Sequence, residues 1–222
     1  MQKTTTLKGV LFDLDGTLLD TAPGFSAAIN RFLRIRNLPQ FSTHEIRSNV
    51  GRGIKGFLKE TLNIDEHHQD YRPHSAELFN YYHEHMFDDI QLFSGMDEIL
   101  DYLSEHHIPW GIVTNKPSRF TDELIKHLPA LQKAQCVISA DTLNNCKPHP
   151  EPILHACKLM NVEPQDCIYV GDAEIDIIAS KAAGMPVIAA LYGYIHTSED
   201  PLIWLADGYI NHPSELLSIL KR

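Results

Sequence analysis

The chain has 222 residues, of which 43% are hydrophobic and 22% are charged, a composition that suits one substantial globular domain or one domain with an insertion. Its 29 acidic and 19 basic residues give a formal charge of −10, which argues against general nucleic-acid binding because that function needs a basic surface. No run approaches the roughly 18 apolar residues of a membrane span, and residues 1–6 contain no apolar signal region. We therefore expect a cytoplasmic protein with no membrane partner.

The first predicted strand covers residues 7–13, and Gly16 then breaks the chain direction. From about residue 20 to about residue 87 the apolar spacing is helical, with no convincing strand. A first helix begins near Asp20-Thr21-Ala22-Pro23, and two short helical stretches in residues 43–62 flank Gly51-Arg52-Gly53. A longer polar helix follows, with Pro73 either near its start or at a kink in it. This block reads as an inserted second domain.

Strands and helices alternate from Leu92 onward. The predicted helices cover 96–106, 118–128, 150–161, 174–183 and a last segment from Pro213, and the strands cover 110–113, 136–139, 167–170, 187–190 and 208–210. Such alternation predicts a parallel sheet covered on both faces. The predicted fold class is α/β. A Rossmann-like parallel-sheet core would comprise residues 1–18 and 88–222, and a small all-helical cap would comprise residues 19–87.

Asp13 and Asp15 flank the end of the first predicted strand, in the run Asp13-Leu14-Asp15-Gly16-Thr17. If the strand ends at Asp13, the turn allows both carboxylates to face one crevice at the carboxyl end of the sheet, where open α/β sheets place ligands. Two acids there can hold a divalent cation, and one can attack an electrophile while the other handles a proton. On these five residues alone, an Asp-rich turn that closes a strand is an open alternative.

Three further strand ends carry polar residues that could serve the same crevice. Thr114 and Asn115 follow one strand and can donate hydrogen bonds to an oxyanion, and Lys147 between cysteine and proline offers a point charge for a phosphate. Asp172 could complete a metal site, and Asp176, one helical turn later, could hold the loop or a metal-bound water. Each signal alone has an ordinary structural explanation, such as a turn or a helix cap.

Together and in this order, these motifs resemble those of the haloacid dehalogenase superfamily, over nearly the whole chain and including a helical insert of the small-cap type. The resemblance implies a Mg²⁺-dependent phosphatase. Asp13 would be the nucleophile that forms an aspartyl-phosphate, and Asp15 would be the general acid and then the base. The metal would bind the Asp13 carboxylate, the Asp15 backbone carbonyl and Asp172. The phosphoryl oxygens would be received by Thr114, Asn115 and Lys147.

Among small-cap members the chain is similar to the phosphoglycolate phosphatase group, through Leu18-Leu19-Asp20-Thr21, Val113-Thr114-Asn115-Lys116 and Val50-Gly51-Arg52-Gly53. Within that group, the runs 110–117 and 147–152 and the unusual Tyr192-Gly193-Tyr194-Ile195-His196 resemble N-acetylmuramic acid 6-phosphate phosphatases of cell-wall recycling. The expected partner is a small phosphorylated metabolite. Arg52 is the candidate cap residue for contacting it, because neighbouring glycines allow close approach; a solvated arginine in a helix–helix turn is the alternative.

Two other functions fit the same residues. A phosphosugar mutase would use Asp13 and Asp15 but retain and reorient an intermediate, and a non-catalytic regulator would bind metal and phosphate without turnover. The presence of Asp15 argues against carbon–halogen and phosphonate cleavage, which in related enzymes do without an acid at this position. The sequence leaves both a monomer and a homodimer open.

Overall fold

Six short strands form the centre of the computed structural model, which describes residues 7–221. They lie in the order β5-β4-β1-β6-β7-β8, and every neighbouring pair is parallel. The strand positions agree with the predicted ones, because strands buried on both faces are continuous apolar runs. The bounds are β1 (Gly9–Phe12), β4 (Trp110–Val113), β5 (Cys136–Ile138), β6 (Cys167–Gly171), β7 (Val187–Ala190) and β8 (Gly208–Ile210).

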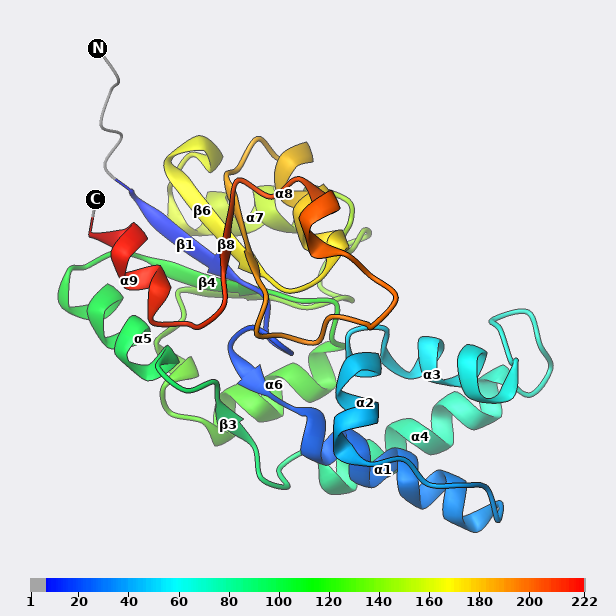
Figure 1. Ribbon diagram of the computed structural model, residues 1–222. Helices are drawn as coiled ribbons and strands as arrows, with labels where there is room; N and C mark the ends of the chain where they lie inside the picture. Colours follow the sequence, from blue (N-terminus) through cyan, green and yellow to red (C-terminus); the bar gives the residue numbers. More distant parts are fainter. Residues whose placement is uncertain (1–6, 222) are drawn as a thin grey trace.

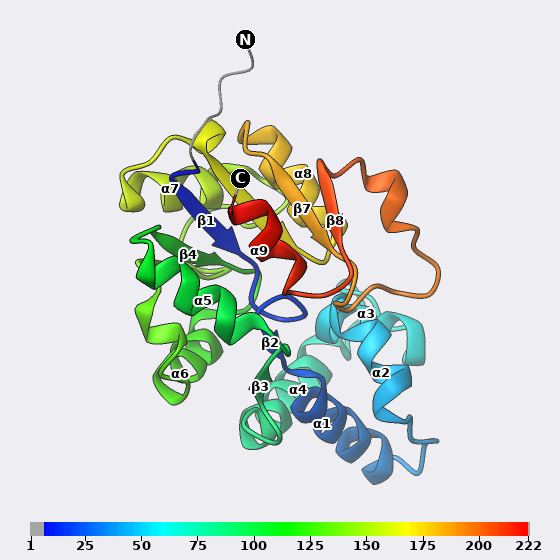
Figure 2. The ribbon, with the colours of Figure 1, turned by 60° about the vertical axis from the view of Figure 1, so that its left-hand side comes forward.

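Helices cover both faces of this sheet (Figure 2). One face packs on α5 (Met96–Glu105), α6 (Ser118–His127) and α9 (Glu215–Leu220), and the other packs on α7 (Glu151–Met160) and α8 (Glu174–Ala182). Side chains alternate along β1, so that Val10 and Phe12 join the first apolar cluster and Leu11 joins the second. Three short 3₁₀ helices complete the core: Leu131–Lys133, Pro164–Asp166 and Pro201–Trp204. The predicted α/β fold class is confirmed.

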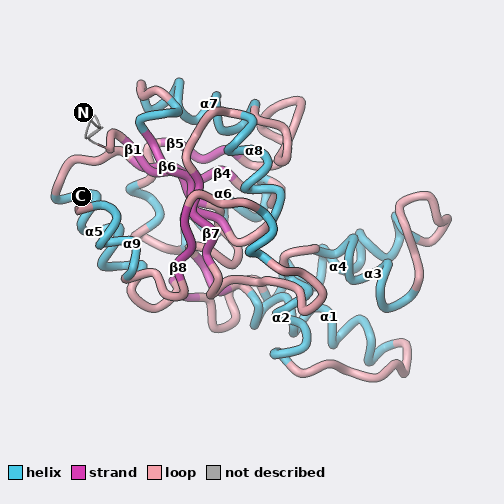
Figure 3. The backbone as a smooth tube through the Cα atoms, turned by 45° about the horizontal axis from the view of Figure 1, so that its top comes forward, coloured by secondary structure: helices cyan, strands magenta, loops and turns pink. Residues whose placement is uncertain are grey.

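Four helices stand to one side of the core: α1 (Ala22–Ile35), α2 (Thr43–Val50), α3 (Gly53–Leu62) and α4 (Tyr71–His85) (Figures 1 and 3). Local sequence explains their ends. Pro23 lies in the first turn of α1, Ser42 and Glu45 form a capping box at α2, and Asn63 closes α3 in the left-handed conformation. Pro73 lies in the first turn of α4, as expected. No helix within residues 7–221 is both long enough and apolar enough to cross a membrane.

The chain passes between core and helical block through a two-stranded antiparallel ribbon, β2 (Leu19–Asp20) with β3 (Gln91–Leu92). The sequence analysis predicted neither strand, because two residues are too few to show a period. All four helices of residues 22–85 lie between these strands, as a cap would, although the domain boundaries themselves stay a prediction. The core strands run with their carboxyl ends toward the cap (Figure 1), so residues at the strand ends face it.

Candidate active site

Asp13 lies at the carboxyl end of β1, where its backbone N–H still donates to the carbonyl of Val170 at 2.9 Å. Its side chain is largely buried, and its Oδ1 accepts from the N–H of Leu14 at 2.7 Å. The chain then turns at Gly16, whose φ of 84° is a conformation that glycine adopts without strain. This turn presents Asp15 beside Asp13 in the same cavity, as the sequence predicted.

Asp172 and Asp176 join Asp13 in a buried acidic cluster, with one carboxylate oxygen from each within 4.8 Å of the others. Asp172 directly follows β6. Its Oδ1 accepts from the hydroxyl of Thr17 at 3.1 Å, and its Oδ2 accepts from the backbone N–H of Tyr194 at 2.7 Å. The cluster therefore brings together three of the predicted acids, Asp13 after β1, Asp172 after β6 and Asp176 in the first turn of α8.

Two glycines close the backbone around Asp172. A Cβ on Gly16 would lie 2.0 Å from Asp172 Oδ2, and a Cβ on Gly193 would lie 2.3 Å from Asp172 Cβ. Both distances are far shorter than any contact between non-bonded atoms, so a side chain at either position would clash with Asp172. The Tyr192–His196 run, which stood out in the sequence as unusual, thus supplies one wall of the acidic cluster.

Lys147 lies at the centre of the site, with its side chain only 1% exposed. Its Nζ lies 3.0 Å from Asp13 Oδ1 and donates to Asp176 Oδ1 at 2.6 Å and to the hydroxyl of Tyr169 at 2.8 Å. Burial alone would lower the pKa of Lys147, but Asp13 and Asp176 raise it overall, so the side chain stays charged. The predicted phosphate cation is therefore held directly against the predicted nucleophile.

Thr114 and Asn115 lie in the turn after β4, and both face neighbouring protein groups. Thr114 is buried, and its hydroxyl oxygen accepts from the N–H of Lys116 at 3.2 Å. The Asn115 amide donates to the carbonyl of Lys147 at 2.8 Å and accepts from its N–H at 3.0 Å. Asn115 thus fixes the Lys147 backbone while it lines the same cavity as Asp13, and its contact with phosphate stays a prediction.

The sequence analysis did not assign roles to Lys116 or Tyr169. Lys116 Nζ donates to both carboxylate oxygens of Asp15, at 3.0 and 3.1 Å, and to the hydroxyl of Tyr82 at 2.8 Å. Tyr169 is fully buried and donates to the carbonyl of Val113 at 2.7 Å. Lys116 could have been found from its place next to Thr114 and Asn115, whereas Tyr169 sits inside an apolar strand and gives no such signal. Tyr82 of α4, a residue buried in the cap, thus has a polar contact with the core.

A cavity of about 570 Å³ opens between these strand ends and the cap. Its wall is largely apolar and aromatic, and includes Phe25, Val50, Ile54, Phe79 and Phe120. Arg52 also lines it. The Arg52 guanidinium is paired with Glu60 and, at 2.7 Å, with Glu199 of the core, so its charge is compensated while it faces the cavity. Its predicted contact with substrate stays a prediction.

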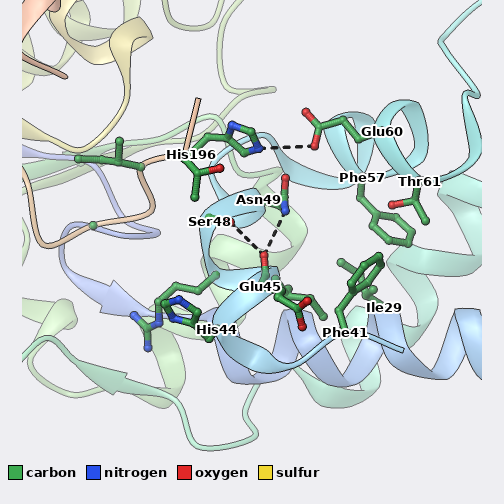
Figure 4. A pocket seen from close by; sticks show the side chains of 15 residues that line it. Ile29, Phe41, His44, Glu45, Ser48, Asn49, Phe57, Glu60, Thr61 and His196 are labelled. Atoms are coloured by element: carbon green, nitrogen blue, oxygen red, sulfur yellow. Dashed lines mark hydrogen bonds and ion pairs between the residues drawn. The ribbon is translucent and has the colours of Figure 1, made fainter. Parts of the chain in front are cut away.

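Glu60, one partner of Arg52, also borders a second pocket of about 550 Å³ on the other side of α2 (Figure 4). There His196 Nε2 lies 3.8 Å from Glu60 Oε2, above an apolar floor that includes Ile29 and Phe57. None of the strand-end acids or lysines lines this pocket. The strand-end acids and lysines therefore face the first cavity and not this pocket.

The family model of the haloacid dehalogenase-like hydrolases matches residues 10–190. The chain belongs to this family. It is 36% identical over 214 residues to an N-acetylmuramic acid 6-phosphate phosphatase of Pseudomonas putida, covering 96% of each chain. It is 39% identical over 212 residues to a phosphoglycolate phosphatase of Xanthomonas campestris pv. campestris, covering 94% of each.

Solved structures show the same fold. A crystal structure described as a predicted phosphoglycolate phosphatase from Haemophilus somnus 129pt superimposes with a TM-score of 0.84 at 25% identity, over 97% of this chain and 99% of that one. The resemblance inferred from sequence is thereby confirmed at the level of family and fold. The predicted enzyme class, a phosphoric monoester hydrolase, agrees with the activities named for these relatives.

Phosphatases of this family generally use Mg²⁺, and the donor set in this hydrolase fits that ion. Asp13 and Asp172 present buried carboxylate oxygens, the ligand type that Mg²⁺ prefers. Burial raises the pKa of Asp13, Lys147 lowers it, and Asp176 and Asp15 raise it again, so that it comes to about 6. Burial, together with Asp13 and Asp176, raises the pKa of Asp172 well above its usual range. If all four carboxylates were ionised, they would exceed the two lysines by two negative charges, which one divalent cation would balance.

These shifts predict how pH and Mg²⁺ change stability. Asp13 and Asp172 hold protons in the folded state above the unfolded-chain pKa of about 4, so without metal the free energy of unfolding should fall as the pH rises from about 4 through about 6. Mg²⁺ should reverse this by binding the ionised carboxylates. Thermal unfolding should show a larger Mg²⁺-induced rise in Tm at about pH 7.5 than at about pH 5. An equal rise at both values would contradict the assignment.

Proposed function

We propose that this chain is a Mg²⁺-dependent phosphatase that cleaves a small phosphomonoester through an aspartyl-phosphate on Asp13. The observation that carries the proposal is the placement of Asp13. Its carboxylate lies at a strand end that faces a cavity, 3.0 Å from Lys147 and clustered with Asp172. Phosphoryl transfer depends mainly on in-line positioning and charge neutralisation; a nucleophile at the edge of the cavity suits the first, and Lys147 with a divalent cation would supply the second.

The reaction would proceed in two displacements at phosphorus. An Asp13 carboxylate oxygen attacks the phosphorus, the ester P–O bond breaks, and the leaving oxygen takes the proton of a protonated Asp15, which becomes a carboxylate. Asp15 then takes a proton from water as the water oxygen attacks the same phosphorus, which releases inorganic phosphate and restores Asp13. Lys147 balances the charge beside Asp13 throughout. Mg²⁺, held by Asp13, the Asp15 carbonyl and Asp172, would neutralise phosphoryl charge.

The cavity supports a sugar phosphate of the N-acetylmuramic acid 6-phosphate type as substrate. At about 570 Å³ it falls in the range of pockets that enclose drug-sized ligands, which exceed 2-phosphoglycolate in size. Its aromatic and aliphatic wall suits the apolar face of a pyranose ring and its methyl groups. Relatives named for each of these substrates resemble the chain about equally, so the cavity is the feature that favours the larger one.

The test is a comparison of kcat/KM for the two esters with purified protein and Mg²⁺. We expect phosphate release from both an aryl phosphate and N-acetylmuramic acid 6-phosphate, with kcat/KM for 2-phosphoglycolate at least about tenfold below the sugar phosphate, a difference of about 1.4 kcal/mol. A preference for 2-phosphoglycolate would contradict the substrate assignment only. Absence of release from all three esters would contradict the proposed function. Isomerised phosphosugar without stoichiometric free phosphate would instead indicate a mutase.

Arg52 provides a second test of the same cavity. Arg52→Gln should raise KM for N-acetylmuramic acid 6-phosphate about tenfold or more and leave KM for a small aryl phosphate nearly unchanged, because only the larger ester reaches the cap. The control is Arg34→Gln, an exposed arginine on α1 of the same cap that does not line the cavity. Equal KM values in wild type and Arg52→Gln would remove Arg52 from the substrate site.

A further inference from the structure

The proton donor of the proposed reaction has a single side-chain partner. Within residues 7–221, the Asp15 carboxylate makes hydrogen bonds and an ion pair with Lys116 alone, which donates to Oδ1 at 3.0 Å and to Oδ2 at 3.1 Å. The Asp15 side chain is 22% exposed and the Lys116 side chain 9% exposed, so the pair borders the cavity but is shielded from bulk water. Lys116 therefore decides in which direction the carboxylate plane of Asp15 points.

Lys116 is in turn held by the cap. Its Nζ donates to the hydroxyl of Tyr82 at 2.8 Å, and Tyr82 belongs to α4. Tyr82 is buried, with its ring packed edge-on against Phe25 of α1 at 6.0 Å and against Phe120 of α6 at 5.2 Å between ring centroids. The hydroxyl is thus fixed by packing from both the cap and the core, and it uses the third N–H of the Lys116 ammonium.

Proton transfer to a leaving alkoxide depends on this geometry. A general acid must lie within hydrogen-bond reach of the leaving oxygen, about 2.6–3.2 Å, when the ester bond breaks. Asp15 lies in a turn, where its side chain would otherwise be free to change rotamer. The chain of contacts from Tyr82 through Lys116 removes that freedom, and it exists only when α4 lies in its place against the core.

We propose that Lys116 and Tyr82 are positioning residues for Asp15, an assignment that rests on the proposed phosphatase function. Tyr82 of the cap holds the Lys116 ammonium, and Lys116 aims the Asp15 carboxylate at the leaving-group oxygen. Protonation of the leaving group therefore depends on α4 being packed against the core. Neither residue needs to touch the substrate for this role.

The dependence on leaving group tests the proposal. The value of kcat/KM reports steps up to the first irreversible one, here transfer of the phosphoryl group to Asp13. A p-nitrophenolate leaves without a proton, whereas the alkoxide of a simple alkyl phosphate needs one. Lys116→Met should lower kcat/KM for the alkyl ester about 10²-fold and for p-nitrophenyl phosphate less than about threefold. Tyr82→Phe should show the same selectivity, about tenfold for the alkyl ester.

Matched variants separate positioning from other roles. Tyr81→Phe removes the neighbouring hydroxyl, which donates to Glu77 outside the site. It should change kcat/KM for neither the alkyl ester nor p-nitrophenyl phosphate. In an Asp15→Asn background, Lys116→Met should cause no further leaving-group selectivity, because the two act through one group. Thermal unfolding checks that each variant is folded; if Lys116→Met is not, Tyr82→Phe carries the test.

Two results would overturn the assignment. Equal losses for aryl and alkyl esters in Lys116→Met and Tyr82→Phe would mean that the residues bind substrate or stabilise the fold. Unchanged alkyl-ester hydrolysis in both variants would mean that Asp15 is positioned without them. If the proposed phosphatase function itself is wrong, the wild-type protein will release no phosphate from either ester. That result differs from the two above, and it would also remove the positioning role of Lys116 and Tyr82.

Discussion

Asp13→Asn is expected to abolish Mg²⁺-dependent phosphate release, with a loss of at least about 10⁴-fold in kcat, or about 5.5 kcal/mol of transition-state stabilisation. An amide oxygen is a poor nucleophile, and it cannot form the acyl phosphate that the proposed reaction needs. The measurement is release of inorganic phosphate from p-nitrophenyl phosphate and from the sugar phosphate.

The variant should stay folded, which makes the loss of activity interpretable. Burial holds the pKa of Asp13 at about 6, so its ionised form is unfavourable in the folded protein without metal. Asparagine removes that charge, and Tm without Mg²⁺ should be equal to or above that of wild type. The control is Asp101→Asn, whose exposed partner is Lys133, and which should change neither activity nor Tm measurably. Substantial remaining activity in Asp13→Asn would refute the aspartyl-phosphate mechanism.

The sheet and the positions of the strand-end acids could be predicted from sequence for one physical reason. Parallel strands covered on both faces must be apolar throughout, so the first polar residue after each run marks the sheet edge. Asp13, Thr114 and Asp172 all occupy that position, and the structure places all three at one edge. The order of the strands was not needed, because any parallel sheet gathers its carboxyl ends on one side.

Side-chain partners could not be predicted in the same way. Lys116 and Lys147 both follow strand ends, and nothing in their spacing says that one pairs with Asp15 and the other with Asp13. That choice depends on which strands are neighbours and how far each turn extends. Asn115 illustrates the point, since the sequence suggested a phosphate ligand but gave no sign that its amide also fixes the Lys147 backbone.

The cap was least predictable. Helical spacing identifies the buried face of the cap but not the residues that this face contacts. Tyr82, for example, lies on the buried face like any packing residue, and its spacing does not reveal that its hydroxyl accepts from Lys116. Arg52 was found through its flanking glycines, yet its pairing with Glu199 joins residues 147 positions apart in the chain. The ribbon of β2 and β3 escaped prediction because each strand has only two residues. Contacts across a domain junction leave no periodic signal.

Lys147→Met is expected to impair both stability and catalysis, because it leaves Asp13 and Asp176 as buried carboxylates without their shared cation. Removing one partner of a buried ion pair costs about 3–5 kcal/mol, so without Mg²⁺ the free energy of unfolding should fall by that amount near neutral pH. The transferring phosphoryl group would also lack the positive charge of Lys147, so kcat/KM should fall at least about 10²-fold. Lys133→Met, which breaks an exposed pair with Asp101, should cost less than about 1 kcal/mol.

A double variant separates these two effects. In Lys147→Met/Asp176→Asn the carboxylate that lay 2.6 Å from the ammonium is gone, while its contact with the N–H of Ala173 can be kept by the amide oxygen. Most of the lost stability should return, since one buried charge fewer remains uncompensated. Activity should not return, because Asp13 still has no cation beside the transferring phosphoryl group. Recovery of both stability and activity would mean that Lys147 serves the fold alone and has no part in phosphoryl transfer.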